Sequence, residues 1–327
     1  MSLSRRKAIV AGSLALLLNG CSQGGTRVLR SADTHPEGYP TVEGVKAMAR
    51  LLEERSGGRL RTKLFPGGVL GEERDTLEIT IFGGLDFNRV NLGPLNSIAK
   101  ETLVPTLPFM FRSIAHMRNS MDGAPGDAIL KSLEPHGLVG LCFYDSGARS
   151  FYTTDRLIER PEDLAGLKIR VQNSDIFVSL VEALGGDATP MAYGEVYQGL
   201  LQGVIDGAEN NWPSYESTRH FEAAKYYSLT RHVMAPEVLL MSAKRWAKLS
   251  SEDQALIRQC SKDSVPLMRD IWDARVAQSR AIVMEAGVQL IEPDIAPFQE
   301  RVRPVWDRYL DTPELRALAS GIEAVEG

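Results

Sequence analysis

Two arginines and two asparagines in the middle of the chain are the side chains best suited to hold an anion. Arg149 and Arg170 lie in strand-like segments, and Asn210 and Asn211 follow a helical segment that glycines interrupt. A guanidinium binds a carboxylate through two parallel hydrogen bonds, a geometry that the ammonium of lysine cannot match. These residue types therefore indicate a site that binds an organic anion.

Arg170 is predicted to lie at the carboxyl end of a strand. The alternation in this segment places Lys168, Arg170 and Gln172 on one face of the strand. Ligand crevices of open α/β sheets form outside the carboxyl ends of the strands, which favours a binding role for Arg170. The spacing alone leaves a structural ion pair with a nearby acid as the alternative.

The sequence carries no motif for catalysis. It contains no GxxxxGK[ST] phosphate loop, no GxGxxG after a strand and no GxSxG elbow. The five histidines lack a metal-binding spacing such as HExxH, and no Cys–His cluster could hold zinc. We therefore predict a binding protein rather than an enzyme, with neither a cofactor nor a metal.

The composition is that of an ordinary globular protein. With 327 residues, of which 43% are apolar and 24% charged, the chain can form one large or two medium domains. Its formal net charge is −5. Removal of a leader carrying three basic residues would lower this charge to −8. Nucleic acids bind to basic surfaces, so the charge excludes them as partners.

The amino terminus is typical of a targeting segment. A basic stretch at residues 5–7 precedes an apolar run, Ala8–Leu18, that is shorter than the roughly 20 residues of a membrane-spanning helix. We predict a signal peptide over residues 1–20 and export to the periplasm. The sequence Leu-Asn-Gly-Cys at 18–21 resembles a lipobox, so Cys21 is a candidate for acylation. Ordinary cleavage and twin-arginine export remain alternatives.

Cys142 and Cys260 are the cysteines left after the leader. A disulfide is compatible with an exported protein. Cys142 lies in an apolar run, however, and Cys260 in a helical pattern beside Leu256 and Ile257. We therefore expect two separate buried thiols.

Strand and helix patterns alternate along the chain and predict an α/β fold. Strand-like segments at 27–33, 59–65 and 85–91 are separated by helical patterns that begin near Pro40 and Gly71. This order argues for a mostly parallel sheet covered by helices.

A second α/β unit is predicted to begin near Asp145. An extended stretch at 228–240 is a candidate return crossing into the first unit. A long helical pattern then runs from Ser250 to Ala286, with Pro266 as an expected kink. Because no disordered linker separates the units, we expect several chain crossings and a cleft between two lobes.

Several motifs, in order and over nearly the whole mature chain, resemble the solute receptors of tripartite ATP-independent periplasmic (TRAP) transporters, the DctP-type family. The motifs are FPGGVLGEE at 65–73, GLKIRV at 166–171, TPMAYGEVYQGL at 189–200 and DGAEN at 206–210. The resemblance implies a two-lobed α/β periplasmic binding protein, a venus flytrap, with a long C-terminal helix spanning both lobes. It also implies a monomer that delivers a carboxylate ligand to a TRAP membrane permease.

The implied lobes can be placed along the chain. Lobe I would comprise residues 27–147 and 235–275, and lobe II residues 148–234 and 276–312. In this family the arginine of the LKIR-type strand binds the ligand carboxylate, which implicates Arg170. Arg149 would assist it, and Asn210 would orient the carboxylate.

Other positions implied by the resemblance face the far end of the ligand. They are Glu73, Arg89 and Asn91. The motifs DTHP at 33–36 and ENNWPSY at 209–215 look like the branch that takes uronates such as glucuronate and galacturonate.

A uronate would need one cationic group to bind its carboxylate and several hydrogen-bond partners for its hydroxyls. The candidates for the hydroxyls are His35, Glu73, Asn91, Gln172 and Asn211. Arg89 keeps a C4-dicarboxylate open as the alternative ligand, since it could hold a second carboxylate. His35 could equally cap a turn, and Trp212 and Tyr215 could either form a wall against the sugar face or pack the hinge.

Overall fold

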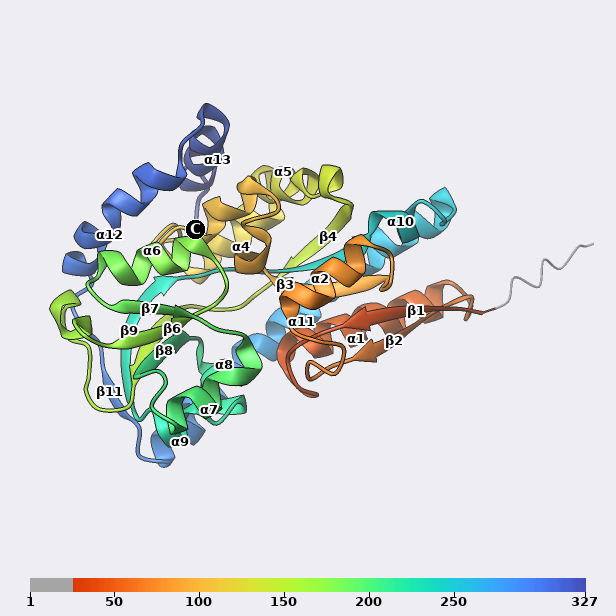
Figure 1. Ribbon diagram of the computed structural model, residues 1–327. Helices are drawn as coiled ribbons and strands as arrows, with labels where there is room; N and C mark the ends of the chain where they lie inside the picture. The colour runs from red at the N-terminus through yellow and green to blue at the C-terminus, as the bar shows by residue number, and fades with distance from the viewer. Residues whose placement is uncertain (1–25) are drawn as a thin grey trace, which may run out of the picture.

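The computed structural model describes residues 26–327, which form two lobes, each built on its own sheet (Figure 1). The predicted signal peptide and Cys21 lie outside the described residues. The strands of the first sheet are β1 (Arg27–Ala32), β2 (Leu60–Phe65), β3 (Phe87–Asn91), β4 (Leu138–Tyr144) and β10 (Glu237–Ser242). The strands of the second are β5 (Arg149–Thr153), β6 (Lys168–Val171), β7 (Asp187–Pro190), β8 (Gly207–Asn210), β9 (Tyr226–Val233) and β11 (Gln289–Ile291).

Helices connect these strands and follow the last of them. Those between the strands of the first sheet are α1 (Pro40–Arg55), α2 (Glu73–Ile81), α3 (Leu92–Leu95), α4 (Ile114–Asp122) and α5 (Ala124–Ser132). Those between the strands of the second are α6 (Asp175–Ala183), α7 (Val196–Leu201), α8 (Trp212–Ser217) and α9 (His220–Ala223). After β10 come α10 (Ala243–Trp246), α11 (Ser251–Glu285), α12 (Ala296–Tyr309) and α13 (Pro313–Glu323).

Each sheet is parallel except for one strand. The orders are β2-β1-β3-β10-β4 and β11-β9-β5-β8-β6-β7. In the first sheet β10 runs antiparallel to β3 and β4, and in the second β5 runs antiparallel to β8 and β9. The prediction of mostly parallel sheets is therefore confirmed, with one exception in each.

The two antiparallel strands are the ones that enter from the other lobe. The chain passes from β4 into β5, and later from β9 into β10, so it crosses between the sheets twice. The stretch predicted as a return crossing is thus two strands, joined at residues 234–236. Because each entering strand is antiparallel, its first residue lies at the carboxyl edge of the sheet that it joins. Arg149 and Glu237 are these first residues.

The long helix α11 contacts both lobes. Its N-cap residue, Ser250, accepts a hydrogen bond from the backbone nitrogen of Asp253, at 3.1 Å. Along its length α11 packs on α1 and β4, and then on α8. Pro266 lies inside the helix without ending it. This arrangement confirms the predicted helix that spans both lobes.

The two cysteines of the described residues, Cys142 and Cys260, are both buried and free, as expected. Between residues 26 and 327 we find no helix that is both long enough and apolar enough to cross a membrane.

Candidate ligand-binding site

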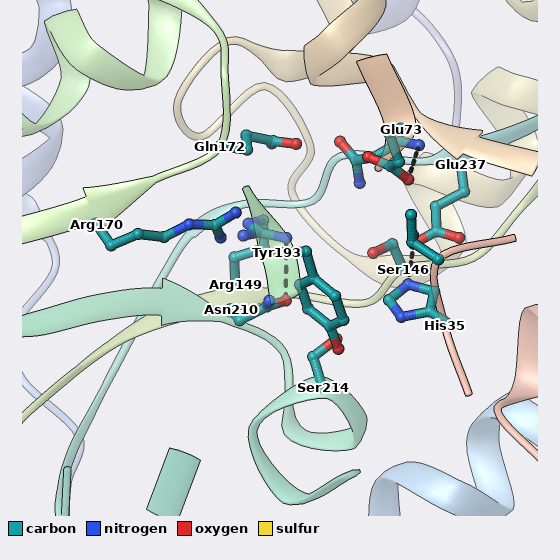
Figure 2. A pocket seen from close by; sticks show the side chains of 12 residues that line it. His35, Glu73, Ser146, Arg149, Arg170, Gln172, Tyr193, Asn210, Ser214 and Glu237 are labelled. Carbon is teal, nitrogen blue, oxygen red and sulfur yellow. Dashed lines mark hydrogen bonds and ion pairs between the residues drawn. The ribbon is translucent and has the colours of Figure 1, made fainter. Parts of the chain in front are cut away.

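A cavity of about 360 Å³ lies between the carboxyl edges of the two sheets (Figure 2). Both lobes and the first crossing line it, and nearly every lining side chain is polar. The lining residues are Thr34, His35, Glu73, Asn91, Ser146, Arg149, Arg170, Gln172, Tyr193, Asn210, Ser214 and Glu237.

Arg170 is a buried cation without an acidic partner in the described part of the chain. It extends from β6 into the cavity and is 3% exposed. Its Nε and Nη2 atoms both donate to the carbonyl oxygen of Met191, at 3.0 and 2.7 Å. Burial lowers the pKa of Arg170, even though Glu209 favours the charged form. A bound anion would supply the partner that this guanidinium lacks.

Arg149, in contrast, is already paired. Its Nε and Nη2 atoms donate to the two carboxylate oxygens of Glu209, at 2.5 and 2.8 Å. Burial alone would raise the pKa of Glu209, but Arg149 and His232 lower it to about 2. The remaining nitrogen, Nη1, donates to Asn210 Oδ1 at 3.0 Å. Glu209 therefore orients Arg149, and Arg149 in turn orients Asn210.

The opposite wall of the cavity is acidic. Glu73 and Glu237 line it, while Arg89 lies behind them and is fully buried. Arg89 Nη1 lies 3.0 Å from Glu73 Oε1 and 2.9 Å from Glu237 Oε2, and Arg89 Nε donates to Asp33 Oδ2 at 2.9 Å. Three carboxylates thus surround one guanidinium, so this wall keeps a net negative charge.

Arg89 does not reach the cavity, contrary to what the sequence suggested for it. Its strand, β3, lies between β1 and β10 in the centre of the first sheet. Asp33 follows β1, and Glu237 begins β10, so carboxylates on both sides hold the guanidinium within the lobe. Arg89 is therefore paired with carboxylates of the protein itself and is not available to bind the second carboxylate of a dicarboxylate ligand.

Several buried polar atoms of the cavity lack a hydrogen bond within residues 26–327. They are His35 Nδ1, Gln172 Nε2, Tyr193 Oη and Glu237 Oε2. Glu237 Oε2 is close to Arg89, as described above, but without the angles of a hydrogen bond. Burial raises the pKa of Tyr193 to about 12, so its hydroxyl keeps its proton. These atoms can donate to or accept from the hydroxyls of a ligand.

His35 lies in the cavity wall. Its Nε2 atom is 3.3 Å from Glu237 Oε1, and its ring stacks on Tyr39 with a centroid distance of 3.8 Å. The turn that contains His35 is closed by Asp33, whose Oδ1 accepts from the backbone nitrogen of His35 at 2.8 Å. The side chain of His35 therefore faces the cavity and does not cap the turn.

Two of the predicted residues have structural hydrogen bonds at helix starts. Asn91 lines the cavity and also caps α3, since its Oδ1 accepts from Gly93 N at 3.1 Å. Asn211 does not line this cavity. Its Oδ1 caps α8 by accepting from Ser214 N at 2.8 Å, and its Nδ2 donates to Ser146 O at 2.8 Å.

Trp212 and Tyr215 pack inside the second lobe. The indole of Trp212 stacks on Tyr227 with centroids 4.0 Å apart, and the hydroxyl of Tyr215 donates to Ala224 O at 2.5 Å. Neither residue lines the ligand cavity. Packing, rather than a wall for a sugar face, is what the structure shows for both.

The sequence reasoning missed Thr34, Ser146, Tyr193, Ser214 and Glu237. A signal for Glu237 was present, because it is the one charged residue in the run from Val233 to Ser242. A lone acid at the start of an apolar strand must be paired or lie at a site, since an isolated buried charge is costly. Its place at the carboxyl edge, however, depends on the antiparallel direction of β10.

The two sides of the cavity differ in charge. Within residues 26–327, no group of three His, Cys, Asp or Glu side chains is placed to hold a metal ion. An unpaired guanidinium lies on one side of the cavity, and acidic acceptors lie on the other (Figure 2). Such a site is complementary to a molecule with an anionic end and a hydroxyl-bearing end.

This fold and site define a two-lobed binding protein for a small organic acid. Residues 31–312 match the family described as bacterial extracellular solute-binding protein, family 7. The chain belongs to this family, which confirms the resemblance to the receptors of TRAP transporters. Members of this class function outside the cytoplasmic membrane, in the periplasm.

Solved structures of the same class are close to this one. A TRAP periplasmic solute-binding protein from a Bradyrhizobium species, in complex with D-galacturonate, is 52% identical with a TM-score of 0.90, covering 91% of this chain and 100% of that one. The protein from Xanthobacter autotrophicus Py2, with bound β-D-galacturonate, is 50% identical with a TM-score of 0.90 and the same coverage. A solute-binding protein of Chromohalobacter salexigens is 41% identical over 296 residues, which are 90% of this chain and 88% of the relative.

Proposed function

We propose that this protein is a TRAP receptor for a hexuronate, D-galacturonate or D-glucuronate, and that Arg170 binds the carboxylate. The observation that carries the proposal is the buried guanidinium of Arg170, whose protein partner in the described residues is one carbonyl oxygen. A charge-assisted, bidentate contact in a cavity that excludes water is a strong interaction. Arg149 and Asn210 lie beside it and would hold the same carboxylate.

The opposite wall favours hydroxyls over a second carboxylate. Glu237 and Glu73 accept hydrogen bonds from hydroxyls, whereas a second anionic group would be repelled by them. His35, Gln172 and Tyr193 offer further polar atoms without partners in the described residues. This charge distribution, together with the uronates bound to two relatives at 50% and 52% identity, supports a uronate over a C4-dicarboxylate.

The proposed role is capture without turnover. The receptor would bind its ligand as a monomer and deliver it to the integral permease of a TRAP transporter. A lipid anchor at Cys21 would keep it near that permease. Comparing the membrane and soluble periplasmic fractions of the wild type and a Cys21→Ser variant tests the anchor, because only an acylated wild type would be found with the membrane.

Calorimetry with a small set of ligands tests the function. The set comprises D-galacturonate, D-glucuronate, D-glucose and succinate. We expect the uronates to bind at least 100-fold more tightly than glucose, which lacks the carboxylate, and than succinate, which brings a second one. Ligand recovered after long incubation should be chemically unchanged. Tighter binding of succinate than of both uronates would contradict the proposed ligand, and a converted product would contradict the receptor role.

A further inference from the structure

A second cavity lies on the other face of the segment that joins β4 to β5. Ser146 and Arg149 line the ligand cavity, whereas Gly147, Ala148 and Ser150 line the second one. The two cavities therefore share one wall, which is the chain crossing between the lobes.

Most of the side chains that line this second cavity are apolar or aromatic. Met234 belongs to the other crossing, and Leu229 precedes it in β9. Trp272 and Val276 come from α11, and Trp212 from α8. The cavity measures about 790 Å³, including the open space at its mouth. Both crossings and the helix that spans the lobes thus meet around one space, which we call the hinge cavity.

The hinge cavity also offers hydrogen-bond donors. The indole N–H groups of Trp212 and Trp272 have no hydrogen-bond partner within residues 26–327. Trp306, which lies outside the cavity, differs in that its indole N–H donates to Pro108 O at 2.8 Å. The Nε1 atom of Trp272 lies 3.3 Å from the position that a Cβ on Gly147 would take, so this donor lies at the cavity wall. Glycine at position 147, with a φ of +58°, keeps this space clear.

A cation lies in the wall as well. Arg231 lines the hinge cavity and is paired with Glu292 at 2.5 Å, but the two side chains are 45% and 62% exposed. A surface pair of this kind contributes little and is easily replaced by another anionic partner. Asp273, the acidic residue in the lining, is held by Arg118 through two hydrogen bonds of 3.1 and 2.6 Å.

We propose that the hinge cavity is a second binding site, for a small aromatic anion. The aromatic ring would lie against the indoles and aliphatic side chains, and the anionic group would accept hydrogen bonds from Arg231 and the indole of Trp272. Such an occupant touches both crossings, so its fit depends on the angle between the lobes. It therefore binds one lobe arrangement better than another and is linked to ligand binding in the other cavity.

Fluorescence titration with 8-anilinonaphthalene-1-sulfonate, an aromatic anion, tests the proposal. Val276→Trp and Ile114→Trp fill the cavity from two sides, and both residues are half-buried, so the fold should tolerate them. Ile282→Trp is the matched control, since Ile282 lies on α11 outside the cavity and is 37% exposed. Thermal unfolding of all four proteins shows that the probe is not binding to a loosened fold.

We expect saturable binding of one probe molecule to the wild type and the control, and at least tenfold weaker binding to both filled variants. Galacturonate should strengthen probe binding about threefold, because both ligands would favour the arrangement in which the cavities have their present shape. Displacement of the probe by galacturonate would overturn the proposal, since it would place the probe in the ligand cavity. Binding to both filled variants as tight as to the wild type would overturn it too.

Discussion

Arg149 and Glu237 hold equivalent positions in the two sheets. Each is the first residue of the strand that runs antiparallel in its sheet, and each lies directly after a crossing from the other lobe. Both side chains line the ligand cavity. Their charges are opposite, so the two crossings bring a cation and an anion to facing walls of one site. The polarity of the cavity is therefore a consequence of how the chain connects its lobes.

Arg170 is expected to matter for binding and not for stability. Its burial without an acidic partner costs free energy in the unliganded protein, so Arg170→Ala should leave the free energy of unfolding unchanged or raise it. Loss of the bidentate contact should weaken uronate binding by about 100-fold, or about 2.7 kcal/mol. Calorimetry and urea unfolding measure the two effects. Arg170→Lys should fall in between, and binding by Arg170→Ala within threefold of the wild type would refute the role.

Arg89 is expected to show the reverse pattern. Arg89→Met leaves the buried carboxylates of Asp33 and Glu237 and the half-buried one of Glu73 without their common cation, which should lower the free energy of unfolding by about 3–5 kcal/mol. Urea unfolding at pH 7 measures the loss. Arg74→Met is a suitable control, because Arg74 is 77% exposed and 4.0 Å from its partner Glu78. An Arg89→Met protein as stable as this control would show that the cluster does not stabilise the fold.

Glu237 should set the preference for hydroxyls. Glu237→Gln keeps the size of the side chain but removes a negative charge from the wall opposite Arg170. We expect galacturonate to bind roughly tenfold more weakly, because a charged acceptor of a hydroxyl is replaced by a neutral one. Succinate should bind better than it does to the wild type. Calorimetry with both ligands gives the ratio of affinities, and an unchanged ratio would argue against this role.

Gly93 of the first lobe and Gln172 of the second lie in close contact across the cavity, so substitutions at these positions test the contact between the lobes. A Cβ on Gly93 would lie 2.5 Å from Cδ of Gln172, so Gly93→Ala should push this side chain out of place. We expect uronate binding to weaken several-fold, with little change in stability. In a Gln172→Ala background the extra methyl meets no amide, so Gly93→Ala should then have no further effect. Additive effects in this double-mutant cycle would contradict the contact.

Acid should destabilise the protein as two buried glutamates become protonated. The pKa values of Glu209 and Glu237 are about 2 in the folded protein, against about 4.3 for an unfolded chain. Between these values the unfolded state binds more protons, so the free energy of unfolding falls as the pH drops from about 5 to 2. Glu73 acts in the opposite direction, because burial raises its pKa.

Urea unfolding at several pH values measures this dependence. Glu209→Gln removes one of the two groups, so the variant should lose less stability than the wild type between pH 5 and pH 3. A wild type whose stability is flat over this range would contradict the assignment of low pKa values to both glutamates.

The sequence by itself determined the elements and one end of the site. Apolar periodicity and capping residues such as Ser250 predicted α11 and the strand of Arg170. Both signals are local, because whether a segment forms a helix or a strand depends largely on residues close together in the sequence. The position of Arg170 at the carboxyl end of a parallel strand was readable for the same reason. The buried, separate cysteines also followed from the character of their surroundings.

The other end of the site was decided by the tertiary structure. Glu237 reaches the cavity because β10 runs antiparallel between β3 and β4, and strand direction within a sheet depends on residues far apart in the sequence. Arg89 is held within its lobe because Asp33 and Glu237 converge on it from neighbouring strands. Asn211 and Trp212 follow the site residue Asn210 in sequence, but the turn into α8 directs both of them to the hinge cavity and not to the ligand cavity. Which charges remain unpaired is settled only when distant strands meet.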